Sequence, residues 1–220
     1  MDVASVISYV AVIVVAYALG GIPWALIIGK RFYHLDMREH GSGNLGATNV
    51  FRTLGAKAAV ATLLLDAAKG SAAVGIAYAV FSGSGDSPRQ WAMIIATIAA
   101  ILGHSYSPYI RFAGGKGVAT AAGALLVLTP APWPFLLGTW IVIIVLFRLV
   151  SLGSVIIAIE YPLLCAVFYP GDWPIIGFAA VTAALVIWRH RTNIARIIRG
   201  EESKVSFGDR GSATRGKDAS

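Results

Sequence analysis

Near its start the chain holds an apolar stretch, residues 3–29, that is long enough to cross a lipid bilayer. A helix rises about 1.5 Å per residue, so about 20 apolar residues span the roughly 30 Å of bilayer hydrocarbon. The stretch is too long for a cleaved signal, and Asp2 stands where a signal peptide carries basic residues. We therefore predict that this segment is a transmembrane helix.

The rest of the chain also has the composition of a membrane protein. Of its 220 residues, 57% are apolar or aromatic and 13% are charged, whereas soluble domains average about 45–50% apolar and about 25% charged residues. This balance excludes a water-soluble enzyme and predicts an all-α, polytopic bundle of membrane helices. Further candidate spans lie at residues 58–81, 91–102, 118–128, 133–149, 155–169 and 173–188.

Two short segments leave the number of crossings open. The segments at residues 91–102 and 118–128 are shorter than the about 20 residues that a span needs, and Gly, Ser, Pro or charged residues bound them. Such segments are typical of half-helices or re-entrant elements that line a cavity. We expect seven spans, or five or six if these segments do not cross.

The basic residues predict the orientation. An odd number of crossings places sixteen of the 18 Lys and Arg residues on one face, namely Lys30, Arg31, Arg38, Arg52, Lys57, Arg111, Lys116, Arg148, Arg189, Arg191, Arg196, Arg199, Lys204, Arg210, Arg215 and Lys217. By the positive-inside rule this face is cytoplasmic, so the N-terminus lies outside and the C-terminus inside. The net charge of +7 then reflects topology and anion binding, and no nucleic-acid partner is expected.

The remaining composition bounds the chemistry and the domain organisation. The single cysteine, Cys165, lies in an apolar span and supports neither a disulfide framework nor a cysteine-based zinc site. From residue 202 onward the chain is rich in Ser, Gly and charge. We predict one membrane domain over residues 1–204 and a flexible polar tail over residues 205–220.

Polar residues gather in three clusters on the predicted cytoplasmic face. The first reads HGSGNLGATN at residues 40–49 and is followed by Arg52. Its glycines allow tight turns and close approach to a ligand, while its polar side chains supply neutral donors; these residues are Gly41, Ser42, Gly43, Asn44, Gly46, Thr48 and Asn49. A loop of this kind before a helix can cradle an oxyanion, or it can be a capped polar turn.

The second cluster joins residues 103–108, GHSYSP, to residues 111–120, RFAGGKGVAT. It is not a Walker A loop, because Ile110 occupies the position of that motif's first glycine. Its glycines nevertheless bring backbone N–H groups, a helix N-terminus and the Lys116 ammonium to one point, an arrangement that suits phosphate. The residues concerned are His104, Gly114, Gly115, Lys116 and Gly117. The alternative is a lysine that snorkels to the lipid headgroups.

The third cluster combines two pairs of residues. Ser151 and Ser154 follow the fifth candidate span, and His190 and Asn193 follow the seventh. Each pair is three residues apart and so shares a helix face. Either pair alone fits helix capping or packing as well as it fits a site.

Three ionisable residues lie inside predicted spans. Asp66 and Lys69 are three residues apart on one helix face, and Glu160 has no partner in its own segment. An unpaired charge at the centre of a bilayer costs at least about 2.5–3.5 kcal/mol, so we expect Asp66 and Lys69 to form a structural ion pair.

Together these clusters predict a membrane-surface site for anionic, phosphorylated ligands. The chain contains no His-x-x-x-His pair, no Gly-x-Ser-x-Gly elbow and no dinucleotide-binding fingerprint. A transporter for a phosphorylated solute is the competing prediction, because short segments and intramembrane charges are typical of transporters. A non-catalytic assembly factor would leave three Gly- and Ser-rich polar clusters without a purpose.

The motifs HGSGNLGATN, GHSYSPYIRFAGGKGVAT, SLGSV (residues 151–155) and HRTNIARIIRGE (residues 190–201) resemble the successive motifs of the bacterial acyl-phosphate:glycerol-3-phosphate acyltransferase family, PlsY. The resemblance extends to about Lys204. Arg111 and Ala113 stand where many relatives have lysine.

The resemblance implies transfer of a fatty acyl group from acyl phosphate to the 1-hydroxyl of glycerol 3-phosphate. The products would be lysophosphatidate and inorganic phosphate, in the first acylation of bacterial phospholipid synthesis. It also implies seven helices in the cytoplasmic (inner) membrane with the motifs at the cytoplasmic face. We expect no cofactor or metal, and we expect acyl phosphate, glycerol 3-phosphate and membrane lipids as the partners of a monomer.

From this assignment we predict roles for the site residues. Ser42 and Asn44 would hold the donor phosphate, and Lys116 and Ser154 would reach toward the departing oxygen. Arg52, His190 and Asn193 would hold glycerol 3-phosphate, and Ser151 would complete the site. His104 or His190 would take the hydroxyl proton, because an imidazole titrates near neutrality. Alternatively, the donor phosphate itself would accept the proton in a substrate-assisted route.

Overall fold

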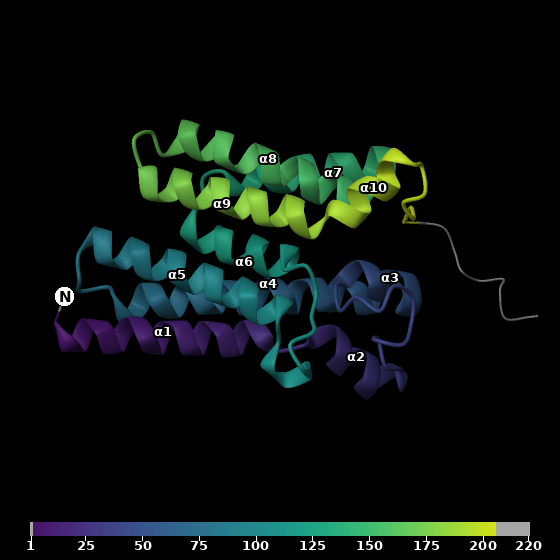
Figure 1. The fold of residues 1–220 in the computed structure, drawn as a ribbon, viewed down its shortest axis with the longest axis horizontal. Coiled ribbons are helices and arrows are strands. Elements are labelled where there is room, and N and C mark those ends of the chain that lie inside the picture. The colour runs from purple at the N-terminus through teal and green to yellow at the C-terminus, as the bar shows by residue number, and fades with distance from the viewer. Residues whose placement is uncertain (1, 206–220) are drawn as a thin grey trace, which may run out of the picture.

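The computed structural model describes residues 2–205, and within them every regular element is helical. Figure 1 shows the helices running roughly side by side. The elements in chain order are α1 (Val3–Gly21), α2 (Trp24–Tyr33), α3 (Ala47–Leu54), α4 (Ala56–Val80), α5 (Asp86–Ser105), η1 (Pro108–Ile110), α6 (Val118–Leu128), α7 (Trp133–Phe147), α8 (Val150–Phe168), α9 (Trp173–Arg189) and α10 (Arg191–Ile198).

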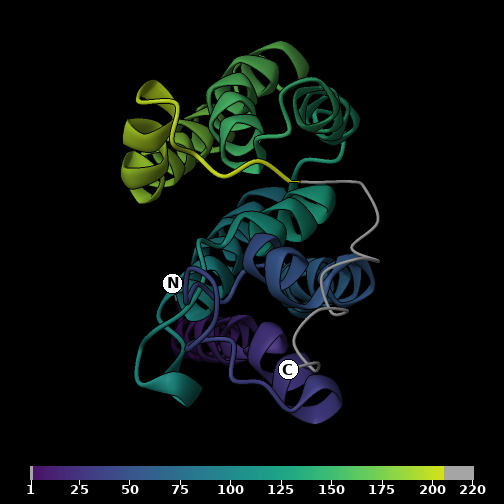
Figure 2. The ribbon, with the colours of Figure 1, turned by 90° about the vertical axis from the view of Figure 1, so that its right-hand side faces the viewer.

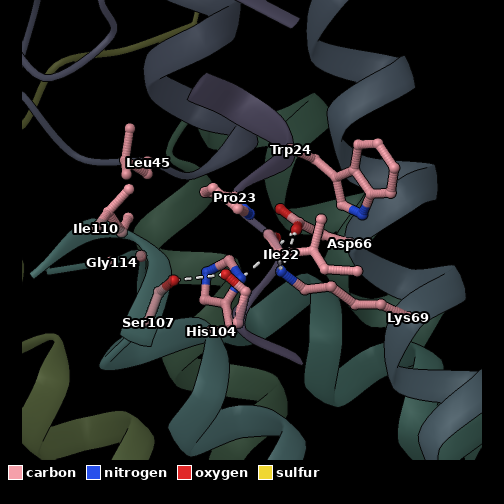
Figure 3. Close-up of a pocket in the computed structure, with 12 residues that line it drawn as sticks. Ile22, Pro23, Trp24, Leu45, Asp66, Lys69, His104, Ser107, Ile110 and Gly114 are labelled. Carbon is pink, nitrogen blue, oxygen red and sulfur yellow. Dashed lines mark hydrogen bonds and ion pairs between the residues drawn. The ribbon is translucent and has the colours of Figure 1, made fainter. Parts of the chain in front are cut away.

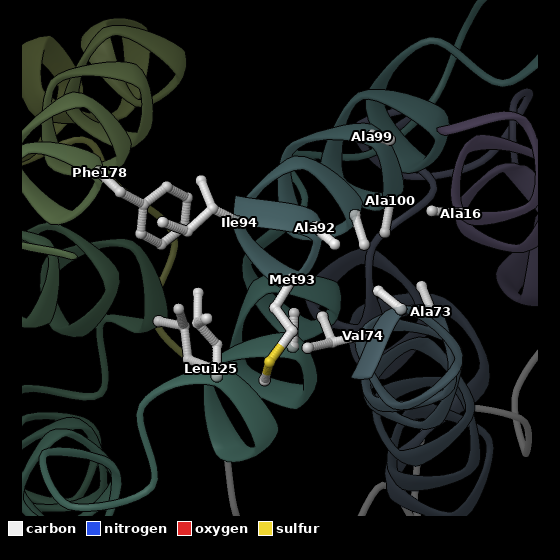
Figure 4. Close-up of a cluster of buried hydrophobic side chains, with 14 of the residues drawn as sticks. Ala16, Ala73, Val74, Ala92, Met93, Ile94, Ala99, Ala100, Leu125 and Phe178 are labelled. Carbon is white, nitrogen blue, oxygen red and sulfur yellow. The ribbon is translucent and has the colours of Figure 1, made fainter. Parts of the chain in front are cut away.

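The helices form two groups, as Figure 2 shows. The first contains α1 to α6 and the second contains α7 to α10. Side chains from both groups meet in one apolar cluster, where Phe178 of α9 approaches Ile94 of α5 and Leu125 of α6 (Figure 4). Polar contacts also join the groups, among them the bonds from Gln90 to Asp172, from Trp133 to the Ala122 carbonyl oxygen and between Thr129 and Tyr161.

Glycine lets the helices of the first group approach closely. A Cβ atom built on Gly70 of α4 would lie 2.0 Å from the carbonyl oxygen of Thr120 in α6, and one built on Gly123 would lie 1.9 Å from the carbonyl oxygen of Ala67. Small residues at helix contacts are typical of membrane proteins, where association depends on close packing. The α4–α6 contact therefore fixes where α6 begins, directly after the second glycine-rich loop.

Within the described residues, four stretches are long and apolar enough to cross a membrane: Val3–Tyr33, Ala56–Val80, Asp86–Ile110 and Val150–Phe168. A fifth forms if α9 and α10, which meet at a 60° bend, count as one span. Helices α6 and α7 are shorter, with 11 and 15 residues. The predicted all-helical membrane bundle is confirmed, while the number of crossings and the orientation of the termini remain predictions.

Two boundaries differ from the prediction. The segment expected to be short at residues 91–102 belongs to α5, which has 20 residues because it begins at Asp86 and continues to Ser105. The first apolar stretch is broken at Ile22 and Pro23, where α1 ends and α2 begins. Proline lacks an N–H group and so interrupts the helical hydrogen bonds, and α2 leaves at an angle (Figure 1).

The structure describes the segment that leads into the predicted tail. Glu202 and Val205 are buried, and the Val205 N–H donates to the carbonyl oxygen of Arg148 at 2.9 Å. Glu202 and Val205 therefore pack on the helix bundle, while the domain boundary itself stays a prediction. The rest of the predicted tail, residues 206–220, lies outside the described residues.

Gly70→Ala is expected to destabilise the fold by about 1–3 kcal/mol, because its Cβ atom would overpack the α4–α6 contact. Gly75→Ala in the same helix is the matched control, since nothing lies within 4 Å of a Cβ atom at that position. Thermal unfolding in detergent compares the two. A Gly70→Ala midpoint equal to that of Gly75→Ala would contradict the packing described.

Candidate active site

The predicted polar clusters gather at one end of the bundle, opposite the N-terminus (Figure 1). They come from the loop between α2 and α3, the loop between α5 and α6, the first turns of α8 and the junction of α9 with α10. The last two segments belong to the second helix group. The site is therefore assembled from both groups.

Asn49 shapes the first glycine-rich loop. Its side chain is buried, its Nδ2 donates to the carbonyl oxygen of His40 at 3.0 Å, and its Oδ1 accepts from the N–H of Ser42 at 2.9 Å. Gly41 has a φ of +62°, and a Cβ atom there would lie 2.2 Å from Asn49 Oδ1. Asn49 is thus engaged within the protein and holds the loop, while the ligand contact expected of it stays a prediction.

The other residues of this loop lie closer to solvent. Ser42 is exposed, and Asn44 and Thr48 are half-buried. Gly43 has a φ of +68°, a left-handed conformation that glycine adopts without strain. Gly46 precedes the first turn of α3, so the loop leads directly into a helix N-terminus.

The second glycine-rich loop rests on His104. The Gly115 N–H donates to the His104 carbonyl oxygen at 3.2 Å. A Cβ atom on Gly114 would lie 2.1 Å from that oxygen, and one on Gly115 would lie 2.2 Å from Nε2 of the imidazole. Gly117, with a φ of +81°, then caps the start of α6. Glycine is therefore required where the loop crosses His104.

A small pocket lies between the two loops (Figure 3). Leu45 from the first loop and Gly114 and Gly115 from the second line it, together with Asp66, Lys69 and His104 below them. Asp66 and Lys69 form the expected ion pair, with 2.8 Å between Oδ1 and Nζ. The structure thus places this pair beside the loops.

Lys116 begins a chain of polar contacts that ends at Glu202. Its Nζ donates to Oδ1 of Asn193, whose Nδ2 donates to Oε1 of Glu202 at 2.7 Å. The Ser151 hydroxyl also donates to Oε1 of Glu202, at 2.8 Å, and Arg196 Nε donates to Oε2 at 2.7 Å. This chain joins the second loop to α8 and α10.

Glu202 is a site residue that the sequence analysis missed. It was assigned to a polar segment beyond the last span, yet its side chain is buried and accepts three hydrogen bonds. Burial tends to raise its pKa, but the bonds from Arg196, Asn193 and Ser151 outweigh that effect and leave the pKa below its usual value. Glu202 lies six residues after Arg196, and this spacing of opposite charges is the sequence signal that could have indicated their ion pair.

Two arginines tie the helix groups together at the site. Arg189 of α9 donates to the carbonyl oxygen of Gly115 at 2.7 Å and lies over the ring of Tyr106. Arg52 of α3 donates to the carbonyl oxygen of Ser203 at 2.8 Å. Arg52 was predicted to bind substrate, whereas Arg189 was counted only toward the topology.

The environment lowers the pKa of Lys116. Burial lowers this pKa to about 8, the Glu202 carboxylate opposes the shift, and the positive charges of Arg196, Arg189 and Arg52 add to it. The Lys116 ammonium therefore loses its proton close to neutral pH, and an added negative charge nearby would raise its pKa.

His190 caps α9 directly after the span. Its Nδ1 lies 2.8 Å from the carbonyl oxygen of Val186, so a neutral imidazole donates from Nδ1 and keeps Nε2 as an acceptor. Burial, assisted by the charge of Lys116, lowers the pKa of His190 to about 4. His190 is therefore neutral at pH 7.

The two serines occupy the first turns of α8 and not the end of the preceding helix, because α8 begins at Val150. Both are buried. The Ser154 hydroxyl donates to the Val150 carbonyl oxygen at 3.0 Å.

Elsewhere in the bundle, Glu160 accepts from the Thr139 hydroxyl at 3.1 Å, which supplies the partner missing from its own segment.

Residues 10–200 match the family model described as glycerol-3-phosphate acyltransferase. Among similar proteins, the glycerol-3-phosphate acyltransferase of Chlorobaculum parvum is 36% identical and covers 93% of this chain and 99% of its own. The enzyme of that name from Bacillus cytotoxicus is 43% identical and covers 89% of this chain and 94% of its own.

The fold is similar to solved structures of PlsY, an integral membrane glycerol 3-phosphate acyltransferase. Its glycerol 3-phosphate form superposes with a TM-score of 0.80 at 38% identity, covering 90% of this chain and 96% of that one. Its lysophosphatidic acid form gives a TM-score of 0.79 at 36% identity, with the same coverage.

Glu202→Gln is expected to lower the pKa of Lys116 below about 8, because it removes the negative charge that supports the ammonium. Amine-labelling mass spectrometry across a pH series would follow the Lys116 midpoint. Glu201→Gln is the control, since Glu201 pairs with exposed Arg199. An unchanged midpoint would contradict the coupling, and a midpoint raised toward that of free lysine would indicate unfolding instead.

Proposed function

The chain belongs to the glycerol-3-phosphate acyltransferase family, and we propose that it transfers a fatty acyl group from acyl phosphate to the 1-hydroxyl of glycerol 3-phosphate. The products are 1-acyl-glycerol 3-phosphate and inorganic phosphate. The observation that carries the proposal is the Lys116 ammonium of the second glycine-rich loop, held by Asn193 at the start of α10.

The reaction needs little covalent help from the protein. The hydroxyl oxygen attacks the acyl carbonyl carbon, a new ester bond forms, and the bond from that carbon to the phosphate oxygen breaks. The electron pair of the broken bond stays on the departing phosphate, which also ends with the hydroxyl proton. Because acyl phosphate is a mixed anhydride and already activated, no acyl-enzyme intermediate is required.

The main task is to hold two phosphate-bearing substrates together against their repulsion. Lys116 begins the polar chain that ends at Glu202, and three further cations lie near it: Arg52, Arg189 and Arg196. We assign the donor phosphate to the first loop near Ser42 and Asn44. Lys116 and Ser154 are assigned to the departing oxygen, which requires the Ser154 hydroxyl to turn away from Val150.

The acceptor substrate is assigned to Arg52, His190 and Asn193. A neutral His190 can accept a hydrogen bond at Nε2 and so orient the attacking hydroxyl. Its pKa of about 4 makes it a weak base. These features support a substrate-assisted route, in which the donor phosphate takes the proton and His190 positions the hydroxyl.

We place the protein in the bacterial cytoplasmic membrane, with this site on the cytoplasmic face. Support comes from the basic residues, sixteen of which the predicted topology assigns to the same face as the glycine-rich loops. Pairing of Asp66 with Lys69, and of Glu160 with Thr139, removes two observations that favoured a transporter.

The direct test supplies purified protein with palmitoyl phosphate and glycerol 3-phosphate. Mass spectrometry should detect lysophosphatidate, and released phosphate should match it in amount. Parallel reactions with acyl-CoA, or with acyl carrier protein that carries an acyl group, as the donor should give no product. Product from either of these donors but not from acyl phosphate would refute the proposed donor, and solute flux in vesicles without any acyl product would favour a transporter.

Lys116→Ala should lower turnover by about 10²-fold or more, as loss of one preorganised donor to a developing oxyanion does.

In the wild type, kcat/KM should fall as the pH rises through about 8, because the buried Lys116 loses its proton there. Lys116→Arg keeps its charge at high pH and should remove this alkaline fall even if its rate is lower. An identical alkaline fall in Lys116→Arg would assign it to another group.

A further inference from the structure

Three ionisable side chains lie buried beneath the second glycine-rich loop. Asp66 is 1% exposed, Lys69 5% and His104 7%. Oδ1 of Asp66 lies 2.8 Å from Lys69 Nζ and 3.5 Å from Nδ1 of His104. Lys69 Nζ also donates to the carbonyl oxygen of Ile22 at 2.7 Å (Figure 3).

Stability alone does not account for this cluster. A buried ion pair contributes little net stability, because desolvation of both ions offsets their attraction, and well-packed apolar residues often replace such a pair without loss. In this protein each member has a further contact. Lys69 reaches the break between α1 and α2, while Asp66 faces His104 on the neighbouring helix. The cluster thus joins three segments that meet below the loops.

His104 transmits this arrangement to the loop. Its carbonyl oxygen accepts from the Gly115 N–H at 3.2 Å, and its ring lies against Gly115, where a Cβ atom would come within 2.2 Å of Nε2. Nδ1 on the other side of the ring faces Asp66. A rotation of the imidazole would therefore displace Gly115, and Lys116 is the next residue along the chain.

We propose that Asp66, Lys69 and His104 act as positioning residues, a buried clamp that sets the loop at Gly114 and Gly115 and thereby aims the Lys116 ammonium. The proposal rests on the proposed function for the part that Lys116 plays in catalysis. It gives His104 a positioning role in place of the base role, because Nδ1 faces Asp66 and the ring lies against Gly115.

The clamp predicts a specific kinetic effect. Asp66→Asn and His104→Asn should lower kcat by up to about 10²-fold, the loss that a 1 Å displacement of a catalytic group can cause. The dependence of kcat/KM on pH should keep its form, since neither residue exchanges a proton with substrate. Loss of a titration limb in His104→Asn would assign the imidazole a catalytic role and overturn the proposal.

A second readout does not depend on activity. Arg111 and Lys116 are trypsin sites within the clamped loop, and exposed Arg38 near the first loop serves as an internal reference. In nanodiscs, cleavage at Arg111 and Lys116 relative to Arg38 should rise in the clamp variants. Equal acceleration at all three sites would indicate general unfolding and would count against a clamp.

Two further variants guard against failure to fold. Asp66→Asn combined with Lys69→Met leaves no unpaired buried charge, so it avoids the ammonium that the single variant would strand. Tyr161→Phe is the control for loss of a buried polar group away from the site, where Tyr161 hydrogen-bonds to Thr129. We expect the double variant to lose turnover and loop protection, and Tyr161→Phe to lose neither.

Wild-type rates and wild-type cleavage in a folded double variant would overturn the clamp. If the wild type itself makes no lysophosphatidate from acyl phosphate, the proposed function fails, while the cleavage ratios still decide whether the clamp exists. Failure of one proposal is therefore distinguishable from failure of the other.

Discussion

The contact between Lys116 and Asn193 is the interaction on which the site depends. Lys116 belongs to the first helix group and Asn193 to the second, and the two groups also meet in an apolar cluster and through other polar contacts, such as Thr129 with Tyr161. Arg189 bonds to the loop residue before Lys116, and Arg52 bonds to the segment that carries Glu202. If the groups separated, Lys116 would lose the partner that holds its ammonium in place.

The charge balance around this contact suits a site that receives anions. Glu202 is the acidic side chain of the polar chain, and its carboxylate is engaged by Ser151, Asn193 and Arg196. Its negative charge opposes the lowering of the Lys116 pKa by burial and by the neighbouring arginines. Bound phosphate would add negative charge and further stabilise the ammonium. The protein thus holds its cations ready in a partly buried place, where each interaction is stronger than in water.

Several features could be predicted from the sequence because they depend on local pattern. Apolar runs predicted the helical bundle, residues 118–128 were assigned the bounds that α6 has, and spacing paired Asp66 with Lys69. The features that were missed depend on contacts between distant segments. The bond from Arg52 to Ser203 joins residues that lie far apart in the chain, and no periodicity reveals such a contact. Glu202 was missed because its nearby partners Asn193 and Arg196 do not by themselves indicate burial, and Ser151 is brought to it only by folding.

The central claim is that Lys116 and Asn193 act as one unit across the two helix groups, and a double-mutant cycle tests it most directly. Turnover would be measured for Lys116→Met, Asn193→Ala and the double variant, with folding checked by thermal unfolding. Residues in one hydrogen-bond network commonly show coupling of about 0.5–3 kcal/mol. We predict that the double variant is little worse than the more damaged single variant. Losses that simply add would show that the two residues act independently and would contradict the account.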